Sequence, residues 1–489
     1  MVNAAKFRSW AAVLLLAALV LTAAAWLRGA EYDEQYTLFL TAGTPRPDWP
    51  QAIFPAGAVA AVQAGHATLA GIARDLRATD VHPPLYFWAV SLWREAFGPS
   101  LFAARMMSVL CGVVSLGLIG VIARRCAIPP VASMLLALGC YGFVYTNAIA
   151  RGFAPAQMLT LCGIALLLGR RPLLAGLSLG AACCCNYLAV FVAAAAITAT
   201  GAWVAVLSAI PLLALDAWFF AAQHAARTGQ FPPFKIWPSL LRLAEYDTAA
   251  VFGGLPLYAD GFWRTVLGAI VSLVAAGLAV CVARARPLRT GPAMRLVLAA
   301  AVAPPIGLLL LGAVFDNTPI ELRYLSFGLP FIALLIALAS LPMPSPGRPR
   351  RSFVSLVVLP LALTVQSASI AGLLLSPRTM QPARATAIEA AHLTGDGIVL
   401  LPAGNDGVGI VGAFGIEAPP SLPILLIRPT DSIADRIAPY HRVVIAMLTQ
   451  DRDSIAAIAN LHAVLVPPNW RRITVGSNVE VYERSADGH

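Results

Sequence analysis

The feature of this sequence that most constrains its fold is a succession of long apolar segments that fills most of the chain before residue 375. A helix needs about 20 apolar residues to cross the hydrocarbon core of a bilayer, and about ten or eleven such segments can be placed here. Of the 489 residues, 59% are hydrophobic and 12% are charged, and the mean hydropathy is +0.76. Soluble proteins are far less apolar. The sequence therefore predicts an α-helical polytopic membrane protein with about 11 transmembrane helices.

The C-terminal part of the chain has a different character. Residues 376–489 are mixed and polar, and short β-rich runs alternate in them with helical stretches. We expect strands at residues 397–401, 442–447, 463–466 and 479–482, and helices at residues 384–393, 432–438 and 454–461. This pattern predicts a membrane domain over residues 1–375, with a polar loop at 29–100, followed by a small soluble α/β domain over residues 376–489.

The net charge of +10 indicates the membrane topology rather than nucleic-acid binding, because the arginines lie in short clusters beside apolar segments. Cationic loops stay cytoplasmic, so Arg124 and Arg125, and likewise Arg170 and Arg171, are expected inside. The first apolar run follows Lys6 and Arg8 and is expected to be a retained anchor, although Ala23 to Ala25 would also suit a signal peptide. The loop at 29–100 and the C-terminal domain are then extracytoplasmic.

One segment leaves this topology open. Residues 84–97 are short for a span and contain Arg94 and Glu95. If they cross the membrane, Arg124 and Arg125 end outside. If they form an amphipathic helix in the interface, with Trp88 and Trp93 as anchors, those arginines end inside. The second arrangement agrees with the arginine pattern and is the one we expect. It requires residues 172–220 to cross the membrane three times, as short helices with a break near Asn186 and Tyr187.

Two other patterns carry no specific chemistry. All eight cysteines lie in or beside apolar segments, with no disulfide framework and no zinc spacing, so they are expected to be packed thiols. The glycine-rich sequence GNDGVGIVGAFG at residues 404–415 lacks the strand, spacing and acidic residue of a nucleotide fingerprint, and is expected to be a loop.

The polar loop contains two acidic motifs, EYDE at residues 31–34 and TDVHPPLYFW at residues 79–88. Further along come the arginine of LFAARMMSVL at 101–110, IARGFAP at 149–155, NYLAV at 186–190 and ELRYLSFGLPF at 321–331. Together these motifs resemble those of the GT-C glycosyltransferases, in particular the branch of protein O-mannosyltransferases, aminoarabinose transferases and lipopolysaccharide sugar transferases. The resemblance covers residues 1–340.

The resemblance implies a GT-C fold and an inverting glycosyltransferase of the cell envelope. Such an enzyme moves a hexosyl or pentosyl group from a polyprenyl-phosphate-linked donor to a glycan, lipid or protein acceptor. The reaction takes place at the outer face of the cytoplasmic (inner) membrane. A sugar on a lipid phosphate already carries a good leaving group, so the enzyme needs a base for the acceptor and cations for the phosphate.

Four acidic or histidine residues match the catalytic positions of the family. Asp33 matches the general base, Glu34 its partner, and Asp80 and His82 the second loop site. The alternative for Asp33 and Glu34 is that they cap or solvate the end of the first span. Relatives often carry an acidic residue or a lysine beside the Pro-Pro pair, so His82 could equally shape a turn.

Five further residues match donor-binding positions, each near the outer membrane edge: Arg105, Arg151, Tyr187, Arg323 and Tyr324. A single arginine at a helix end often only snorkels to the interface, and three beside one acidic loop favour phosphate binding. Some relatives have a basic residue where Asn186 and Tyr187 stand, which leaves the role of Tyr187 open. Lys235, Glu245 and Asp247 are expected to be solvated loop charges.

Other function classes share some features of this sequence. A transporter would place ionisable residues at the bilayer midplane, where Asp216 is the main acidic candidate. An O-antigen-type ligase or polymerase would share the lipid-linked donor. Asp33 and Glu34 could together hold a divalent cation, but the sequence offers no third ligand and the related branch generally works without one, so the sequence leaves metal dependence open and no cofactor is certain. The expected partners are the donor, the acceptor and membrane lipids, with no nucleic acid.

Overall fold

The computed structural model describes residues 4–223, 231–253, 261–284, 291–339, 359–375, 382–403, 407–448 and 451–485. The chain divides into two compact units. The first comprises Met1–Leu27, Ala73–Val90 and Ala104–Ser376, and the second comprises Arg28–Ile72, Ser91–Ala103 and Pro377–His489. Residues 376–381, where the predicted domain boundary falls, and the arginine-rich segment 342–351 lie outside the described residues.

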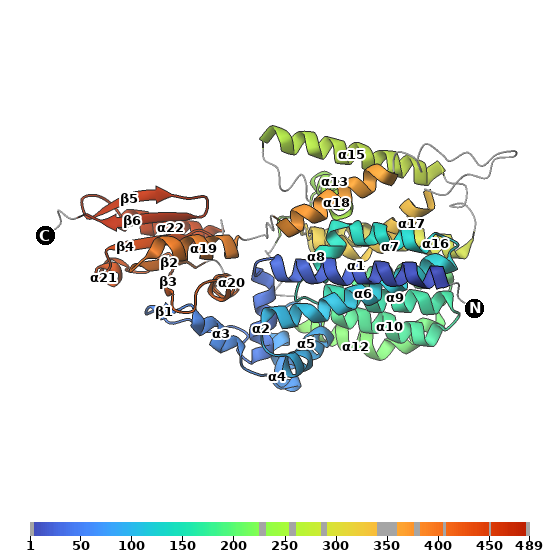
Figure 1. Ribbon diagram of the computed structural model, residues 1–489. Helices are drawn as coiled ribbons and strands as arrows, with labels where there is room; N and C mark the ends of the chain where they lie inside the picture. The colour runs from blue at the N-terminus through green and yellow to red at the C-terminus, as the bar shows by residue number, and fades with distance from the viewer. Residues whose placement is uncertain are drawn as a thin grey trace. The chain divides into compact units, whose positions relative to one another are not determined.

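The first unit is a bundle of apolar helices (Figure 1). Among the described residues, four helices are long and apolar enough to cross a membrane: α1 (Ala4–Leu27), α6 (Leu101–Arg125), α12 (Val204–Gln223) and α16 (Pro292–Phe315). Shorter apolar helices are α7 (Pro130–Gly139), α9 (Phe153–Leu168), α10 (Pro172–Cys185), α11 (Ala189–Thr200), α17 (Leu329–Ala339) and α18 (Leu359–Leu375). Helix α15 (Gly261–Arg284) contains a further apolar stretch, Val266–Gly277. The predicted polytopic helical architecture is confirmed.

The described part of the bundle also contains α8 (Tyr141–Asn147), α13 (Ile236–Phe252) and the 3₁₀ helix η3 (Leu322–Phe327). Helix α10 packs against α9 and α12, α11 packs against α16, and α8, α13 and η3 contact one another. Residues 172–220, expected to contain three helices with a break near Asn186 and Tyr187, form α10, α11 and α12. Asn186 caps the end of α10 in an extended conformation, and its side chain accepts a hydrogen bond from the backbone of Leu188.

The polar loop of the sequence is largely helical. It forms α2 (Tyr32–Ala42), the short strand β1 (Phe54–Pro55), α3 (Gly57–Gln63), α4 (Leu69–Thr79) and α5 (Pro84–Phe97). Helix α5 has the bounds expected for the interfacial segment, but Arg94 within it is buried at 2% exposure. Its guanidinium donates to the carbonyl oxygens of Leu38, Gln63 and Pro99 and to the hydroxyl of Thr41. Three backbone carbonyls and one hydroxyl therefore accept hydrogen bonds from the buried guanidinium of Arg94.

The second unit contains a six-stranded sheet in the order β1-β3-β2-β4-β6-β5. The strands from the C-terminal region are β2 (Ile398–Pro402), β3 (Pro423–Ile427), β4 (Arg442–Ala446), β5 (Trp470–Val475) and β6 (Val479–Arg484). Strand β2 is parallel to β3 and β4, and the other pairs are antiparallel. Strand β1 therefore extends the sheet from the N-terminal half of the chain, with Phe54 opposite Ile424.

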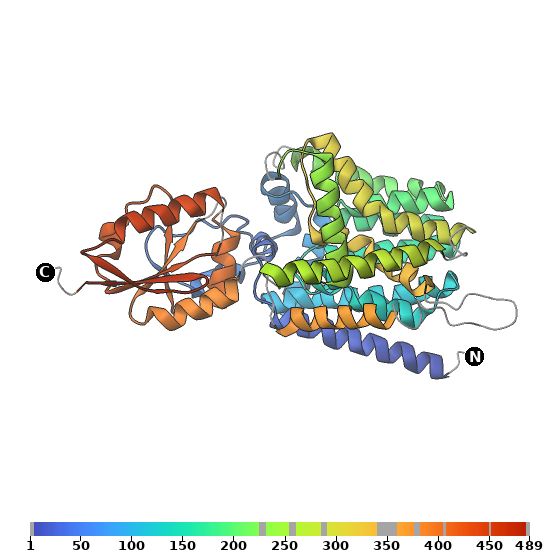
Figure 2. The ribbon, with the colours of Figure 1, turned by 90° about the horizontal axis from the view of Figure 1, so that it is seen from above.

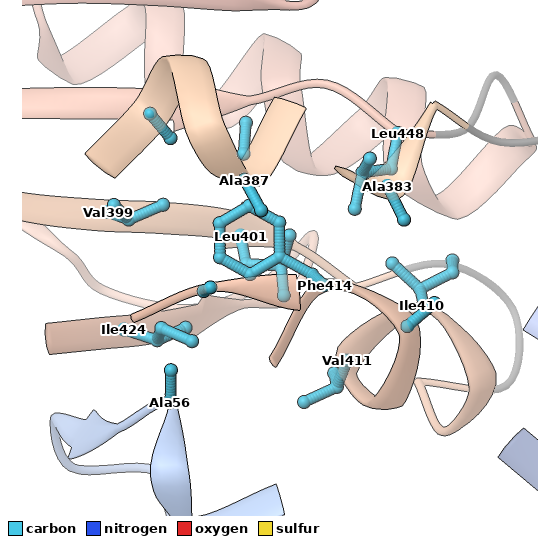
Figure 3. Packing of buried hydrophobic residues seen from close by; sticks show 14 of the residues in the cluster. Ala56, Ala383, Ala387, Val399, Leu401, Ile410, Val411, Phe414, Ile424 and Leu448 are labelled. Atoms are coloured by element: carbon cyan, nitrogen blue, oxygen red, sulfur yellow. The ribbon is translucent and has the colours of Figure 1, made fainter. Parts of the chain in front are cut away.

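Helices cover both faces of this sheet (Figure 2). Successive residues of a strand point to opposite faces. Val399 and Leu401 accordingly pack with α19 (Ala383–Thr394) and α20 (Gly409–Glu417), whereas Ile398 and Leu400 pack with α21 (Ala434–Ile437) and α22 (Arg452–Val464). Figure 3 shows the first of these two cores, in which Phe414 of α20 lies among Leu401, Ala387 and Ile410. The predicted small α/β domain is confirmed.

Several local predictions in this domain were wrong. Residues 463–466 do not form a strand, because α22 continues to Val464 and places Leu461 and Leu465 in the core. Strands β3 and β5 were not predicted. Most of the glycine-rich sequence is helical rather than a loop, since α20 begins at Gly409, and residues 404–406 lie outside the described residues. Packing against neighbouring helices overrides the low helix propensity of glycine there.

Candidate active site

The EYDE motif forms the N-terminus of helix α2. Glu31 is the N-cap residue, and the Glu34 carboxylate accepts a hydrogen bond from the Glu31 backbone N–H at 3.0 Å. The Glu31 side chain in turn accepts from the Glu34 backbone, which completes a reciprocal capping box, and it also pairs with the buried Arg28. Glu31 and Glu34 are buried, whereas Asp33, in the first turn, is partly exposed. The two adjacent carboxylates of the motif therefore differ: Glu34 stabilises the helix start, and Asp33 is accessible.

The second motif places its acid and its histidine against an arginine from another part of the chain. Nδ1 of His82 lies 2.6 Å from the Asp80 carboxylate, and Nε2 of His82 lies 2.9 Å from Nη2 of Arg151. The Asp80 carboxylate is 8% exposed and the His82 ring 27%, while Arg151 is buried. The ring of His82 thus bridges the buried carboxylate of Asp80 and the buried guanidinium of Arg151, which lies 69 residues after His82 in sequence.

This arrangement determines the charge of Asp80. Burial raises the pKa of its carboxyl, but the attraction of His82, a hydrogen bond from His82 and the charge of Arg151 outweigh burial. The net effect holds the pKa of Asp80 well below its ordinary value. Asp80 is therefore ionised at neutral pH and is poorly suited to take a proton from an acceptor.

The segment that carries Arg151 also contacts the segment that carries Arg323 and Tyr324. The ring of Phe153 stacks on Tyr324, with centroids 6.2 Å apart, and lies 6.3 Å from Phe327. One turn further along α9, Gln157 donates a hydrogen bond of 2.7 Å to the carbonyl of Ser326. The IARGFAP and ELRYLSF motifs therefore meet in the first unit.

Gly152, between Arg151 and Phe153, is required by close packing. A Cβ at this position would collide with the carbonyl oxygen of Cys185 and would lie 3.3 Å from Cβ of Tyr86. Only glycine lets the backbone approach this closely. The contact brings the end of α10, just before Tyr187, and the start of α5 to the Arg151 segment.

Tyr187 lies here in a hydrogen-bonded chain that the sequence did not predict. Its hydroxyl donates to Oε1 of Gln223 at 2.9 Å. Nε2 of Gln223, which is buried at the end of α12, donates to the carbonyls of His82 at 2.9 Å and Leu76 at 3.0 Å. A single glutamine at a helix end gives no sequence signal for this role.

The two remaining arginines have different surroundings. Arg105 of α6 is buried, and its Nη1 donates to the carbonyl of Ala25 at 2.8 Å. Ser108, one turn along α6, donates to the carbonyl of Ile149 and so joins this helix to the Arg151 segment. Arg323 is partly exposed and lies over the ring of Tyr324, at 5.5 Å from its centroid.

The predicted site residues thus fall into two groups. Asp33 and Glu34 belong to the second unit, and the other seven predicted residues belong to the first. Within the first unit, contacts join the segments that carry Asp80, His82, Arg151, Tyr187 and Tyr324. Among the described residues, no group of three or more His, Cys, Asp or Glu side chains is arranged to hold a metal ion.

Three comparisons relate this chain to known proteins. No family model matches the sequence, and no curated protein matches it. Among solved structures, it is similar to ArnT (aminoarabinose transferase) from Cupriavidus metallidurans bound to undecaprenyl phosphate, with a TM-score of 0.51 and 12% identity over 98% of both chains. The apo form of ArnT gives a TM-score of 0.50 and 13% identity, again over 98% of both chains.

The protein has the GT-C fold. The likeness to ArnT spans the helical bundle and the C-terminal domain alike, because it covers 98% of both chains. An oligosaccharyltransferase of Archaeoglobus fulgidus, tethered to an acceptor peptide, matches at 12% identity over 84% of this chain and 64% of its own. Its TM-score of 0.38 is too low to establish a common fold. The GT-C fold predicted from the motifs is confirmed.

Proposed function

We propose that this protein is an inverting glycosyltransferase that takes its sugar from a polyprenyl-phosphate-linked donor at the outer face of the cytoplasmic membrane. The observation that carries the proposal is the GT-C fold shared over 98% of both chains with ArnT, whose crystal structure contains undecaprenyl phosphate. The chain supplies two kinds of group that the reaction needs, an accessible carboxylate at Asp33 and cationic side chains at Arg151 and Arg323.

In the proposed reaction an acceptor hydroxyl attacks the anomeric carbon of the sugar. Asp33 takes the hydroxyl proton as the new C–O bond forms, and the bond from the anomeric carbon to the phosphate oxygen breaks. The electron pair leaves with the polyprenyl phosphate, whose growing negative charge is stabilised by arginine. A single displacement inverts the configuration of the anomeric carbon. The bonds that form and break in this step balance without a metal ion.

The residues have unequal roles in this proposal. Asp33 acts as the general base because it is the accessible carboxylate of its motif, and Glu34 supports it by fixing the first turn of α2. Asp80 and His82 hold Arg151, which with Arg323 and Tyr324 belongs to the donor-phosphate site. Arg105 extends that site from the start of α6, and Tyr187 acts through Gln223.

The donor assignment can be tested by binding. We expect undecaprenyl phosphate to raise the Tm of the full chain in detergent, because a ligand that binds only the folded state stabilises it. Undecaprenol, which lacks the phosphate, and inorganic phosphate, which lacks the lipid, are the matched probes. The stabilisation should weaken in Arg323→Gln and in Arg151→Lys. Equal stabilisation by undecaprenol and undecaprenyl phosphate would contradict a phosphate site.

A further inference from the structure

Helix α20 carries three glycines spaced three residues apart, Gly409, Gly412 and Gly415, which fit against α2 and α3. A Cβ at Gly409 would lie 2.7 Å from the ring of Tyr32, and one at Gly412 would lie 2.8 Å from the ring of Phe39 and 2.9 Å from Cγ of Gln35. A Cβ at Gly415 would collide with Val59 of α3. Real Cβ atoms do not approach neighbours this closely, so a side chain at Gly409 or Gly412 requires a shift between α20 and α2, the helix that carries Asp33, and one at Gly415 requires a shift between α20 and α3.

Polar contacts hold the entry to α2 in the same place. Glu417, the last residue of α20, accepts hydrogen bonds from the backbone N–H of Ala30 at 2.6 Å and from Nε of Arg384 at 2.7 Å. Ala30 immediately precedes the capping-box residue Glu31. Glu417 of α20, which Arg384 of α19 holds in place, thus binds the backbone directly before the acidic motif.

The other end of α2 is fixed by the buried Arg94. This side chain donates to the carbonyl of Leu38 at 3.2 Å and to the hydroxyl of Thr41, near the C-terminus of α2, and also to the carbonyl of Gln63 at the end of α3. Cations near the C-terminus of a helix are stabilising, and these acceptors compensate the burial of the charge. Nε2 of Gln63 donates in turn to Oε1 of Gln35 on α2 at 2.8 Å.

The apolar side of α2 belongs to the core of the sheet. Phe39 is fully buried in the same cluster as Val399 and Leu401 of β2 and Phe414 of α20, and Tyr32 and Tyr36 pack against this cluster. Strand β1 joins the same sheet from the same N-terminal stretch of the chain. Helix α2 therefore packs against the C-terminal domain on its apolar side and at its start, whereas Arg94 of α5 holds its end.

From these contacts we infer that the C-terminal domain is a positioning element for the catalytic helix, and that Gly409 and Gly412 of α20 set the placement of Asp33. The inference rests on the proposed function, in which Asp33 is the base. It assigns the C-terminal domain a part in the rate of transfer, because a displacement of about 1 Å in a catalytic group can cost about 100-fold in rate.

The test compares Gly412→Ala with Ala456→Ser, which likewise adds one heavy atom, at an exposed position of α22 in the same domain. Two measurements are made on the full chain. Hydrogen exchange of the α2 amides is expected to accelerate in Gly412→Ala only, while the amides of β2 stay protected and show that the domain is folded. The kcat of transfer is expected to fall about 10- to 100-fold, with the donor KM changed less than about twofold.

Each outcome decides a separate point. Unchanged α2 exchange in Gly412→Ala would overturn the inference, and so would faster exchange with an unchanged kcat. Loss of donor affinity without loss of kcat would also overturn it, because the donor arginines lie in the other unit. Failure of the proposed function has a different signature, since the wild-type protein would then not transfer sugar although α2 exchange still responded to Gly412→Ala.

Discussion

The Nη2 atom of Arg151 lies 2.9 Å from the Nε2 atom of His82. A guanidinium only donates hydrogen bonds, so Nε2 of His82 must be the acceptor, and the ring proton is on Nδ1. That proton points at the Asp80 carboxylate, 2.6 Å away. His82 accordingly links the Asp80 carboxylate to the Arg151 guanidinium, and its part in the proposed reaction is to hold Arg151 rather than to accept a proton from the substrate.

The first prediction concerns Asp80→Asn. Because the folded-state pKa of Asp80 lies below its ordinary value of about 4, its ionised form stabilises the protein above that pH, and this contribution is lost as the pH falls through the folded-state value. We expect Asp80→Asn to lower the free energy of unfolding by about 1–3 kcal/mol at pH 6–8. Thermal unfolding between pH 3 and pH 8 measures the difference, which should shrink below about pH 4. A difference that grows in acid would refute the assignment.

The second prediction concerns Gln223→Leu. This change removes the two N–H groups that donate to the carbonyls of His82 and Leu76, and it removes the acceptor of the Tyr187 hydroxyl. We expect a lower Tm and a fall of about tenfold in transfer rate, since each lost hydrogen bond costs about 0.5–1.5 kcal/mol. Tyr187→Phe, which removes only the hydroxyl that orients Gln223, should show a smaller change in the same direction. A larger effect in Tyr187→Phe would instead indicate direct substrate contact by Tyr187.

The third prediction concerns Asp247 of α13, which is not one of the candidate spans. Burial raises the pKa of Asp247 to about 6. The folded state therefore binds a proton more tightly than the unfolded state, and stability falls as the pH rises from about 4 to about 6. We expect Asp247→Asn to raise the Tm at pH 7–8 and to leave it unchanged near pH 4. An equal gain at both pH values would exclude titration of Asp247 as the cause.

The sequence predicted the helical bundle, the α/β domain and the break at Asn186 because hydropathy and period report burial directly. It did not predict α20 as a helix, because its glycines are explained only by the approach of Tyr32, Gln35 and Phe39 from the other end of the chain. Helix propensity carries no information about such a partner.

The candidate site shows the same limit. Asp80 and His82 are two residues apart, so their proximity follows from the sequence, whereas the contact between His82 and Arg151 depends on the fold. Gln223 and Arg94 donate to backbone carbonyls, which every residue carries, so the sequence of the partner segment does not reveal these contacts. Sequence reasoning named the groups that have family counterparts and missed Gln223 and Arg94, which act through backbone carbonyls.

The central claim is that Asp33 is the base of a sugar transfer from a polyprenyl-phosphate donor. Its most direct test is the kcat of Asp33→Asn in the full chain, with Asp48→Asn as the matched change at an exposed position of the same polar segment. We predict a loss of about 10²- to 10⁴-fold in Asp33→Asn, with undecaprenyl phosphate binding retained, and no loss in Asp48→Asn. Transfer at the wild-type rate by Asp33→Asn would contradict the claim.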